Sequence, residues 1–165
     1  ANEFSIERAG QSLVLWSRSD YHTAGVDFDL VGPRRMDLTI EMEDGEVVFD
    51  DVSGRLDAVA PSIWATGIEG DVDLLATTGS LDAEVDPWTS ARVETFGGDL
   101  RLSLPYGGDY DLQVWGDPDQ PMTIADLGFH SVAEAPGYFA AVSGRGTIRV
   151  DVFVSGGSTT LDARW

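Results

Sequence analysis

The sequence predicts an all-β protein, and three observations lead to this class. Glycine (19) and proline (7) interrupt the chain at short intervals, as expected for short strands and tight turns. The segment 124–142 has a helix-like composition but is broken by Gly128, Pro136 and Gly137, so we expect an irregular excursion there. Apolar and polar residues elsewhere alternate with a period of two, which is typical of strands with one buried face. The clearest alternating segments are 26–30, 37–42, 99–104 and 147–152.

The first expected element is a β-hairpin near the N-terminus. Phe4 and Ile6 alternate with polar residues before the segment 9–11, and Leu13 and Leu15 do so after it. Because that segment contains a glycine between two alternating runs, it predicts a turn that joins two antiparallel strands.

A short glycine motif recurs along the rest of the chain and predicts the architecture. A glycine, one polar residue and then Val, Leu or Ile follow one another at Gly45, Gly54, Gly70, Gly79, Gly98 and Gly146. The first four copies form two pairs with an internal spacing of nine residues, and the pairs are offset by 25 residues. Repeated turn-plus-strand units of this kind favour a β-helix, or solenoid, over residues 1–165 as a single domain. A β-sandwich with regularly spaced strands is the alternative.

The charge of the chain is extreme and limits its partners. It contains no lysine, ten arginines and 29 acidic residues, for a net charge of −19. Molar salt, with a Debye length of about 3 Å, would screen the resulting self-repulsion, and the composition resembles that of proteins from salt-in halophilic archaea. Nucleic acids and anionic membranes attract clustered basic residues, whereas the densest basic spot here is Arg34-Arg35. We therefore expect neither as a partner.

The residues that support catalysis or metal binding are scarce. The absence of cysteine and lysine excludes thiol, Schiff-base and P-loop chemistry. His22 and His130 have no metal-ligand spacing, and Ser143 and Ser155 lie in Ser-Gly turns rather than in a nucleophile elbow. Trp16 and Trp115 are expected in the core. The Asp-x-Asp pairs are expected on solvated strand faces; they are Asp27/Asp29, Asp71/Asp73, Asp109/Asp111 and Asp117/Asp119. We expect no catalytic residue, no cofactor and no metal site.

Several phrases of the chain resemble a known repeat family. "SGRLDAV", "EGDVDLLATTGSLDAEV" and "GGDLRLSLP" within residues 45–104, with the close at 154–161, look like DUF4097-type putative adhesin repeats of bacteria and archaea. This resemblance implies a right-handed β-helix and a non-enzymatic surface or scaffold role. In shape the expected fold is similar to that of the bactofilins, whose β-helices polymerise end to end.

The expected function is that of a structural protein that binds copies of itself. The terminal coils of a solenoid expose unpaired backbone groups and apolar interior, so they must be covered or used for stacking. Strand character at both ends of the chain leads us to expect self-association through Phe4, Ile6, Phe153, Leu161 and Trp165. An adhesin-like module that binds a glycan or a protein is the alternative, and a viral structural subunit is a lesser one.

The sequence leaves the location open between the cytoplasm and a cell or virion surface. The segment 1–5 has neither the basic nor the apolar region of a signal peptide, so none is expected in this chain. Nor does any apolar run approach the roughly 18 residues that a membrane span requires.

Overall fold

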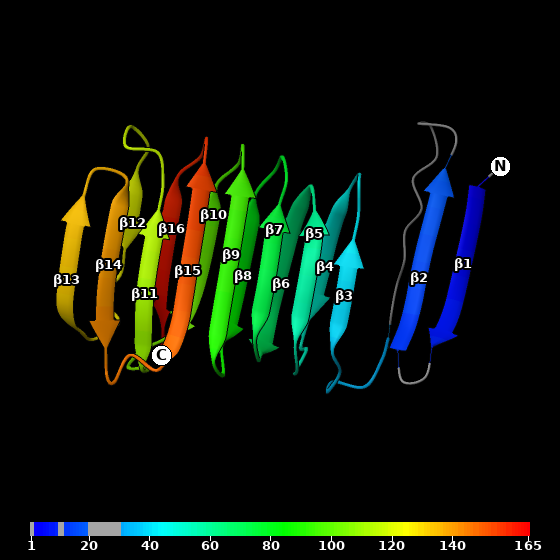
Figure 1. Ribbon diagram of the computed structural model, residues 1–165, viewed down its shortest axis with the longest axis horizontal. Coiled ribbons are helices and arrows are strands. Elements are labelled where there is room, and N and C mark those ends of the chain that lie inside the picture. The colour runs from blue at the N-terminus through cyan, green and yellow to red at the C-terminus, as the bar shows by residue number, and fades with distance from the viewer. Residues whose placement is uncertain (1, 10–11, 20–30) are drawn as a thin grey trace. The chain divides into compact units, whose positions relative to one another are not determined.

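The computed structural model describes residues 2–9, 12–19 and 31–165, and the chain divides into two compact units, Ala1–Gly32 and Pro33–Trp165 (Figure 1). In the described part of the chain, strands and turns make up the secondary structure without a helix, so the prediction of an all-β protein is confirmed. The expectation of one domain spanning residues 1–165 stays a prediction. The strand expected at 26–30 and the residue His22 lie outside the described residues.

The first unit contains the expected hairpin. Strand β1 (Asn2–Ala9) pairs with β2 (Ser12–Ser19) in antiparallel register. Phe4 and Ile6 lie in β1, where their backbones pair with Ser17 and Leu15.

The second unit consists of a six-stranded and an eight-stranded sheet. The strands of the six-stranded sheet are, in spatial order, β12 (Met122–Ile124), β16 (Thr159–Arg164), β10 (Leu100–Pro105), β8 (Leu81–Asp86), β6 (Ser62–Glu69) and β4 (Glu46–Asp50). Those of the eight-stranded sheet are β13 (Phe129–Ala135), β14 (Tyr138–Ser143), β11 (Tyr110–Trp115), β15 (Ile148–Ser155), β9 (Ser90–Phe96), β7 (Val72–Ala76), β5 (Leu56–Ala60) and β3 (Leu38–Glu41).

From β3 to β10 the chain alternates between the two sheets. Odd-numbered strands lie in the eight-stranded sheet and even-numbered strands in the six-stranded sheet, and each strand is parallel to the one two places earlier. We call each odd-even strand pair a coil. Leu56 of β5 is in register with Leu38 of β3 and Val72 of β7. Leu56 and Val72 are buried in the core, and the partly buried Leu38 packs against it. The period-two pattern therefore stacks apolar side chains from coil to coil between the sheets.

After β10 the strand order departs from the order of the sequence. β15 lies between β9 and β11, and β16 lies between β10 and β12, so the coil at residues 148–164 is inserted between two earlier parts of the chain (Figure 1). β13 and β14 form an antiparallel hairpin beyond β11. The irregular excursion expected at 124–142 is thus wrong. Pro136 and Gly137 form the hairpin turn, and Gly137 has the positive φ (70°) that a type II turn requires at its second central position.

At one corner between the sheets, neighbouring coils bring their backbones together. A Cβ atom on Gly98, between β9 and β10, would overlap the backbone of Gly79, between β7 and β8. A Cβ atom on Gly157, between β15 and β16, would likewise overlap the backbone of Gly98. Only glycine permits this approach, so the three residues form a column along the stack.

Candidate functional site

The residues expected to mediate self-association lie in different surroundings. Leu161 is fully buried in the core, and Phe153 is half-buried on the outer face of the eight-stranded sheet. Trp165 is 93% exposed and stacks on Tyr106 with ring centroids 4.2 Å apart. Phe4 lies in the hairpin of the first unit, as does Ile6, and their side chains lie outside the described residues.

The expectation that the last two strands form an open end of the stack is wrong. Both β15 and β16 are paired on two sides, so Phe153 and Leu161 belong to an internal coil. Alternation in the sequence identifies a strand but not its neighbours, because any parallel strand with one apolar face fits equally well between two others. Self-association of the chain stays a prediction. The residues exposed at an end of the stack are not Phe153 and Leu161 but those described next.

One end of the stack is the outer edge of β13. Residues 130–135 are all exposed, and β13 is paired on one side only, with β14. Its inward position at Val132 pairs with Ala141 and is 55% exposed. Between residues 120 and 144 the only acids are Asp126 and Glu134. This end is therefore an accessible strand edge of low charge.

The opposite edges of the two sheets, β3 and β4, carry far more charge. The acidic residues on these strands and their flanking turns are Asp37, Glu41, Glu43, Asp44, Glu46, Asp50 and Asp51. Arg34 forms ion pairs there with Asp51 (3.0 Å) and Glu69 (2.9 Å). Two copies of this edge would repel each other strongly unless salt screened them.

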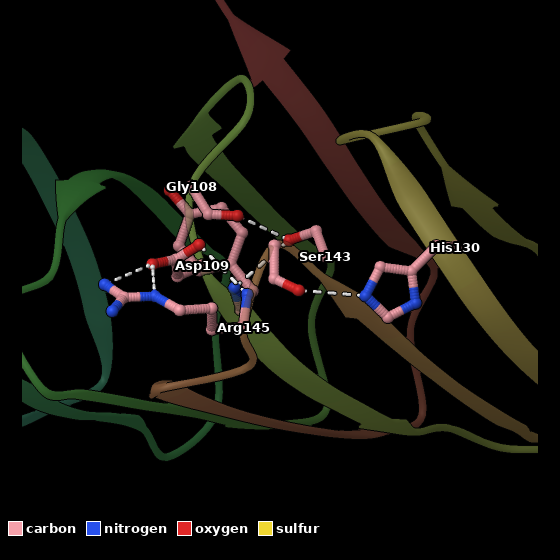
Figure 2. A network of polar contacts seen from close by, with 7 residues as sticks. Gly108, Asp109, His130, Ser143 and Arg145 are labelled. Atoms are coloured by element: carbon pink, nitrogen blue, oxygen red, sulfur yellow. Dashed lines mark hydrogen bonds and ion pairs between the residues drawn. The ribbon is translucent and has the colours of Figure 1, made fainter.

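A polar network beside β13 brings together a serine, a histidine and an aspartate (Figure 2). The hydroxyl of Ser143 donates a hydrogen bond to the carbonyl of Gly108 (2.6 Å) and accepts one from the Tyr110 N–H (3.1 Å). The Nε2 atom of His130 contacts the carbonyl of Gly144 (2.9 Å), and it must carry the proton because a carbonyl only accepts.

The same network lacks the hydrogen-bond pattern of a catalytic triad. Asp109 faces Arg145 rather than His130, with its carboxylate bonded to the backbone N–H (3.0 Å) and the guanidinium (3.1 Å) of that arginine (Figure 2). Ser143 is 1% exposed and bonded to backbone groups, whereas a triad nucleophile bonds the base that activates it. The network therefore joins the β10–β11 and β14–β15 turns, and we assign it a structural role.

Three aromatic side chains form a row on the outer face of the eight-stranded sheet. Trp115 stacks on Phe153 with centroids 4.5 Å apart and an interplanar angle of 3°, and Tyr138 is tilted against Trp115 at 5.8 Å. The guanidinium of Arg92 lies over the far side of this row, 5.7 Å from the centroid of Phe153. The expectation that Trp115 lies in the core is thus wrong, because Leu112 and Val114 face inward and Trp115, at odd spacing from both, faces outward. The side chain of Trp16 lies outside the described residues. The ring faces are largely covered by one another, so the row stabilises the sheet across its strands.

Arginine side chains in the described residues are largely neutralised by acids. In the second unit, every arginine apart from Arg35 forms an ion pair: Arg34, Arg55, Arg92, Arg101, Arg145, Arg149 and Arg164. Three of these pairs join arginine to an acid two residues away on the same strand face, as in Arg149–Asp151 (2.6 Å). A surface of this kind offers phosphate groups little unpaired positive charge.

Several aspartates hold neighbouring coils together at the corners. Asp99, in the β9–β10 turn, accepts hydrogen bonds from the backbone N–H (2.8 Å) and hydroxyl (2.7 Å) of Ser158, which precedes β16. Asp71 accepts bonds from Thr89 and from the Ser90 N–H in the next coil of its sheet. Asp37 accepts one from the Arg55 N–H (2.8 Å). Part of the acidity is therefore structural.

These hydrogen bonds lower the pKa of the carboxyl groups that accept them. The backbone N–H and the hydroxyl of Ser158 lower the pKa of Asp99, and the Arg145 N–H and guanidinium lower that of Asp109. Burial alone would raise the pKa of Asp71, but the bonds from Ser90 and Thr89 outweigh it and lower the pKa. Each group thus binds protons less readily in the folded than in the unfolded chain.

We expect acid to destabilise the stack through these groups. A lowered pKa contributes stability above the unfolded value of about 3.9, and the contribution is lost as the pH falls through the lower, folded value. In about 2 M salt, where general repulsion is screened, the melting temperature should fall between about pH 5 and pH 3. The melting temperature of Asp99→Asn should fall less steeply over this range than that of the parent chain, because the variant lacks one of these carboxyl groups. Parallel curves for Asp99→Asn and the parent chain would contradict this role.

The remaining surface shows few features of a ligand site. A shallow hollow on the outer face of the eight-stranded sheet is lined by Asp57, Asp73 and Glu94, with Arg92 already paired to Glu94. Within the described ranges, no group of three histidine or acidic side chains is placed to hold a metal ion. Over the same residues, no helix is long and apolar enough to cross a membrane.

No family model, curated protein or solved structure matches the chain. The resemblance to DUF4097-type repeats therefore depends on the sequence phrases alone and stays a prediction, as does the halophilic origin. The strand edge at β13 is a feature that the sequence did not indicate. The low charge of residues 124–142, the segment expected to be irregular, is the signal that could have found it.

Proposed function

We propose that this protein is a non-catalytic structural subunit that self-associates, and that its second unit is a right-handed β-helix. Parallel pairing from β3 to β10 supports the β-helix over the sandwich, because the sheets of sandwiches are antiparallel. Each coil passes once through each sheet and stacks on the previous coil. The right hand follows the rule for parallel crossovers and the hand that the repeat resemblance implies.

The open edge of β13 is the observation that carries the self-association. An edge strand presents unpaired N–H and C=O groups and is a template for another strand. Soluble proteins commonly protect such edges with lysine, proline or several charges, but residues 129–135 contain one acid and no proline or lysine. Ion pairs and carboxylates, which favour solvation, are frequent on the rest of the second unit.

Salt should control the association because the subunits carry a net charge of −19. At low ionic strength the repulsion between whole subunits opposes contact at any edge, whereas in molar salt it is screened within about 3 Å. The favoured environment is therefore one of high salt.

We expect sedimentation and negative-stain microscopy in about 2–3 M salt to show a species larger than the monomer. Dilution into low salt should dissociate it before circular dichroism reports unfolding. A strictly monomeric species at high protein concentration would contradict the proposal. Unfolding before dissociation would mean that the acidity serves the stability of the fold rather than its assembly.

An adhesin-like binding module is the second candidate, and the aromatic row favours it. Phe153, Trp115 and Tyr138 gather on a lateral face rather than at an end of the stack, and Trp88, in the β8–β9 turn, is 50% exposed. Sugars bind to open ring faces, however, and those of Trp115 and Phe153 cover each other. A monomer under all salt conditions would make this module the better candidate. A viral structural subunit remains compatible with the self-association that we propose.

A further inference from the structure

We propose that two copies of this chain pair edge to edge through β13, antiparallel, about a two-fold axis at Val132. The inference rests on the proposed function, since it names the surface through which the subunit would self-associate. The partner is a second copy because turning the same strand end to end places Glu134 opposite His130, which is a cation when its imidazole is protonated.

The geometry of β13 leaves room for another strand. Its residues from Ser131 to Ala135 pair in register with Val142 to Tyr138 of β14, while the opposite edge has no neighbour among the described strands. The side chains of Ala133 and Ala135 are small, so they occupy little space on the outward face of β13. A strand added here would extend the eight-stranded sheet into that of the second copy.

Two charges select the register. The ionisable side chains of β13 are those of His130 and Glu134, four residues apart with Val132 midway between them. Antiparallel pairing centred on Val132 places His130 of each copy opposite Glu134 of the other, twice per dimer. Pairing centred on Glu134 would instead place two carboxylates opposite each other, which is unfavourable. The charges thus favour one alignment in a strand whose small residues would otherwise permit several.

The position of His130 is already fixed for this contact. The register of β13 against β14 shifts between Phe129 and Ser131, so His130 lies at a bulge. Its Nε2–H donates to the carbonyl of Gly144, which holds the ring at the start of the strand. When the imidazole is protonated, Nδ1–H is then the donor left for a carboxylate of the second copy. Bulges and inward charges often prevent edge pairing. Here the same two features restrict pairing to one register.

The opposite end of the stack is unsuited to the same use. Two β3 edges would bring Asp37 and Glu41 of each copy close together, along with the acids of the β3–β4 turn. A two-fold contact through β13 keeps these acidic edges far apart and closes after two subunits. The expected product is therefore a dimer.

Val132→Lys tests the contact against Val48→Lys. Both valines are exposed, at 55% and 66%, and Val48 lies on the outer face of β4. Either lysine reduces the net negative charge and the general repulsion, but only Val132→Lys places two like charges opposite each other on the axis. In about 2 M salt, sedimentation equilibrium should show a dimer for the parent chain and for Val48→Lys. The dissociation constant of the Val132→Lys dimer should be about tenfold higher than that of the parent dimer, or more.

The outcomes separate the two proposals. If the parent is monomeric, the proposed function fails together with this inference. If the parent associates and Val132→Lys associates as well as Val48→Lys, the inference alone is wrong. Circular dichroism melts of both variants would establish that each retains the fold.

A charge exchange tests the register. His130→Glu places four carboxylates around the axis and should weaken the dimer by about tenfold. Adding Glu134→Arg restores opposite charges across the axis, so the double variant should recover to within about threefold of the parent. Failure of this rescue, with the dimer still lost in Val132→Lys, would overturn the register centred on Val132.

Discussion

Gly98→Ala is expected to destabilise the second unit by about 3 kcal/mol, the upper part of the usual range for overpacking. The added Cβ atom would overlap the carbonyl carbon and oxygen of Gly79 and crowd the N–H of Ser80. These are backbone atoms of the neighbouring coil, and they cannot rotate away as a side chain can. Gly157 approaches Gly98 in the same manner from the other side, so any displacement of Gly98 also disturbs the inserted coil.

Gly116→Ala is the matched control for this prediction. Its Cβ atom would meet only the terminal methyl of Met122 at 3.3 Å and the hydroxyl of Thr159 at 3.6 Å, and the methyl can move. We expect a change within about 0.5 kcal/mol. Denaturant unfolding of the two variants in high salt gives the comparison, and equal stabilities would argue against the glycine column.

Leu161→Ala should have an effect of similar size, about 2–5 kcal/mol. Leu161 is fully buried, and β16 carries it between β10 and β12, in register with Leu102 on one side and Ile124 on the other. Truncation leaves a cavity that the flanking strands cannot close without losing their pairing. The loss should appear in the thermal unfolding of the whole second unit, because its core is continuous.

The neighbouring residue provides the control for Leu161. Thr160 lies on the opposite face of the same strand, so Thr160→Ala should change the stability by no more than about 0.5 kcal/mol. If residues 148–164 formed an open end, as the sequence alone suggested, Leu161→Ala would cost little more than Thr160→Ala. Equal costs would therefore contradict the inserted position of β16.

The sequence predicted the strands and corners well, because these depend on local chemistry. Gly45 and Gly54 flank β4, and Gly70 and Gly79 flank β7, each at a turn between strands. The coil repeat was less visible. Gly54 stacks on Gly70 and Gly79 on Gly98, at separations of 16 and 19 residues rather than the 25 that joins the sequence pairs. Turns of unequal length hide the period along the chain although the strands remain in register.

The candidate surfaces could not be predicted because they depend on the order of the strands in space. Phe153 and Trp115 are distant in sequence and stack only because β15 lies beside β11. Val132 is an alternating apolar residue like many others, and it is exposed because β13 is an edge. Strand alternation specifies which side chains share a face, whereas the neighbours of each face follow from non-local pairing.

The inserted coil also affects how the protein can be made. Residues 148–164 leave the ribosome after β11 and β14, yet they occupy the place between β9–β10 and β11–β12. The earlier coils can stack during synthesis, but the β13–β14 hairpin cannot join them until the intervening coil arrives. Contacts such as β10 with β16 span about sixty residues, so this last step has a high contact order and should limit the folding rate. Until it is complete, β9, β10, β11 and β12 lack a neighbour on the side of the missing coil, and these open edges are vulnerable to misassembly between neighbouring chains.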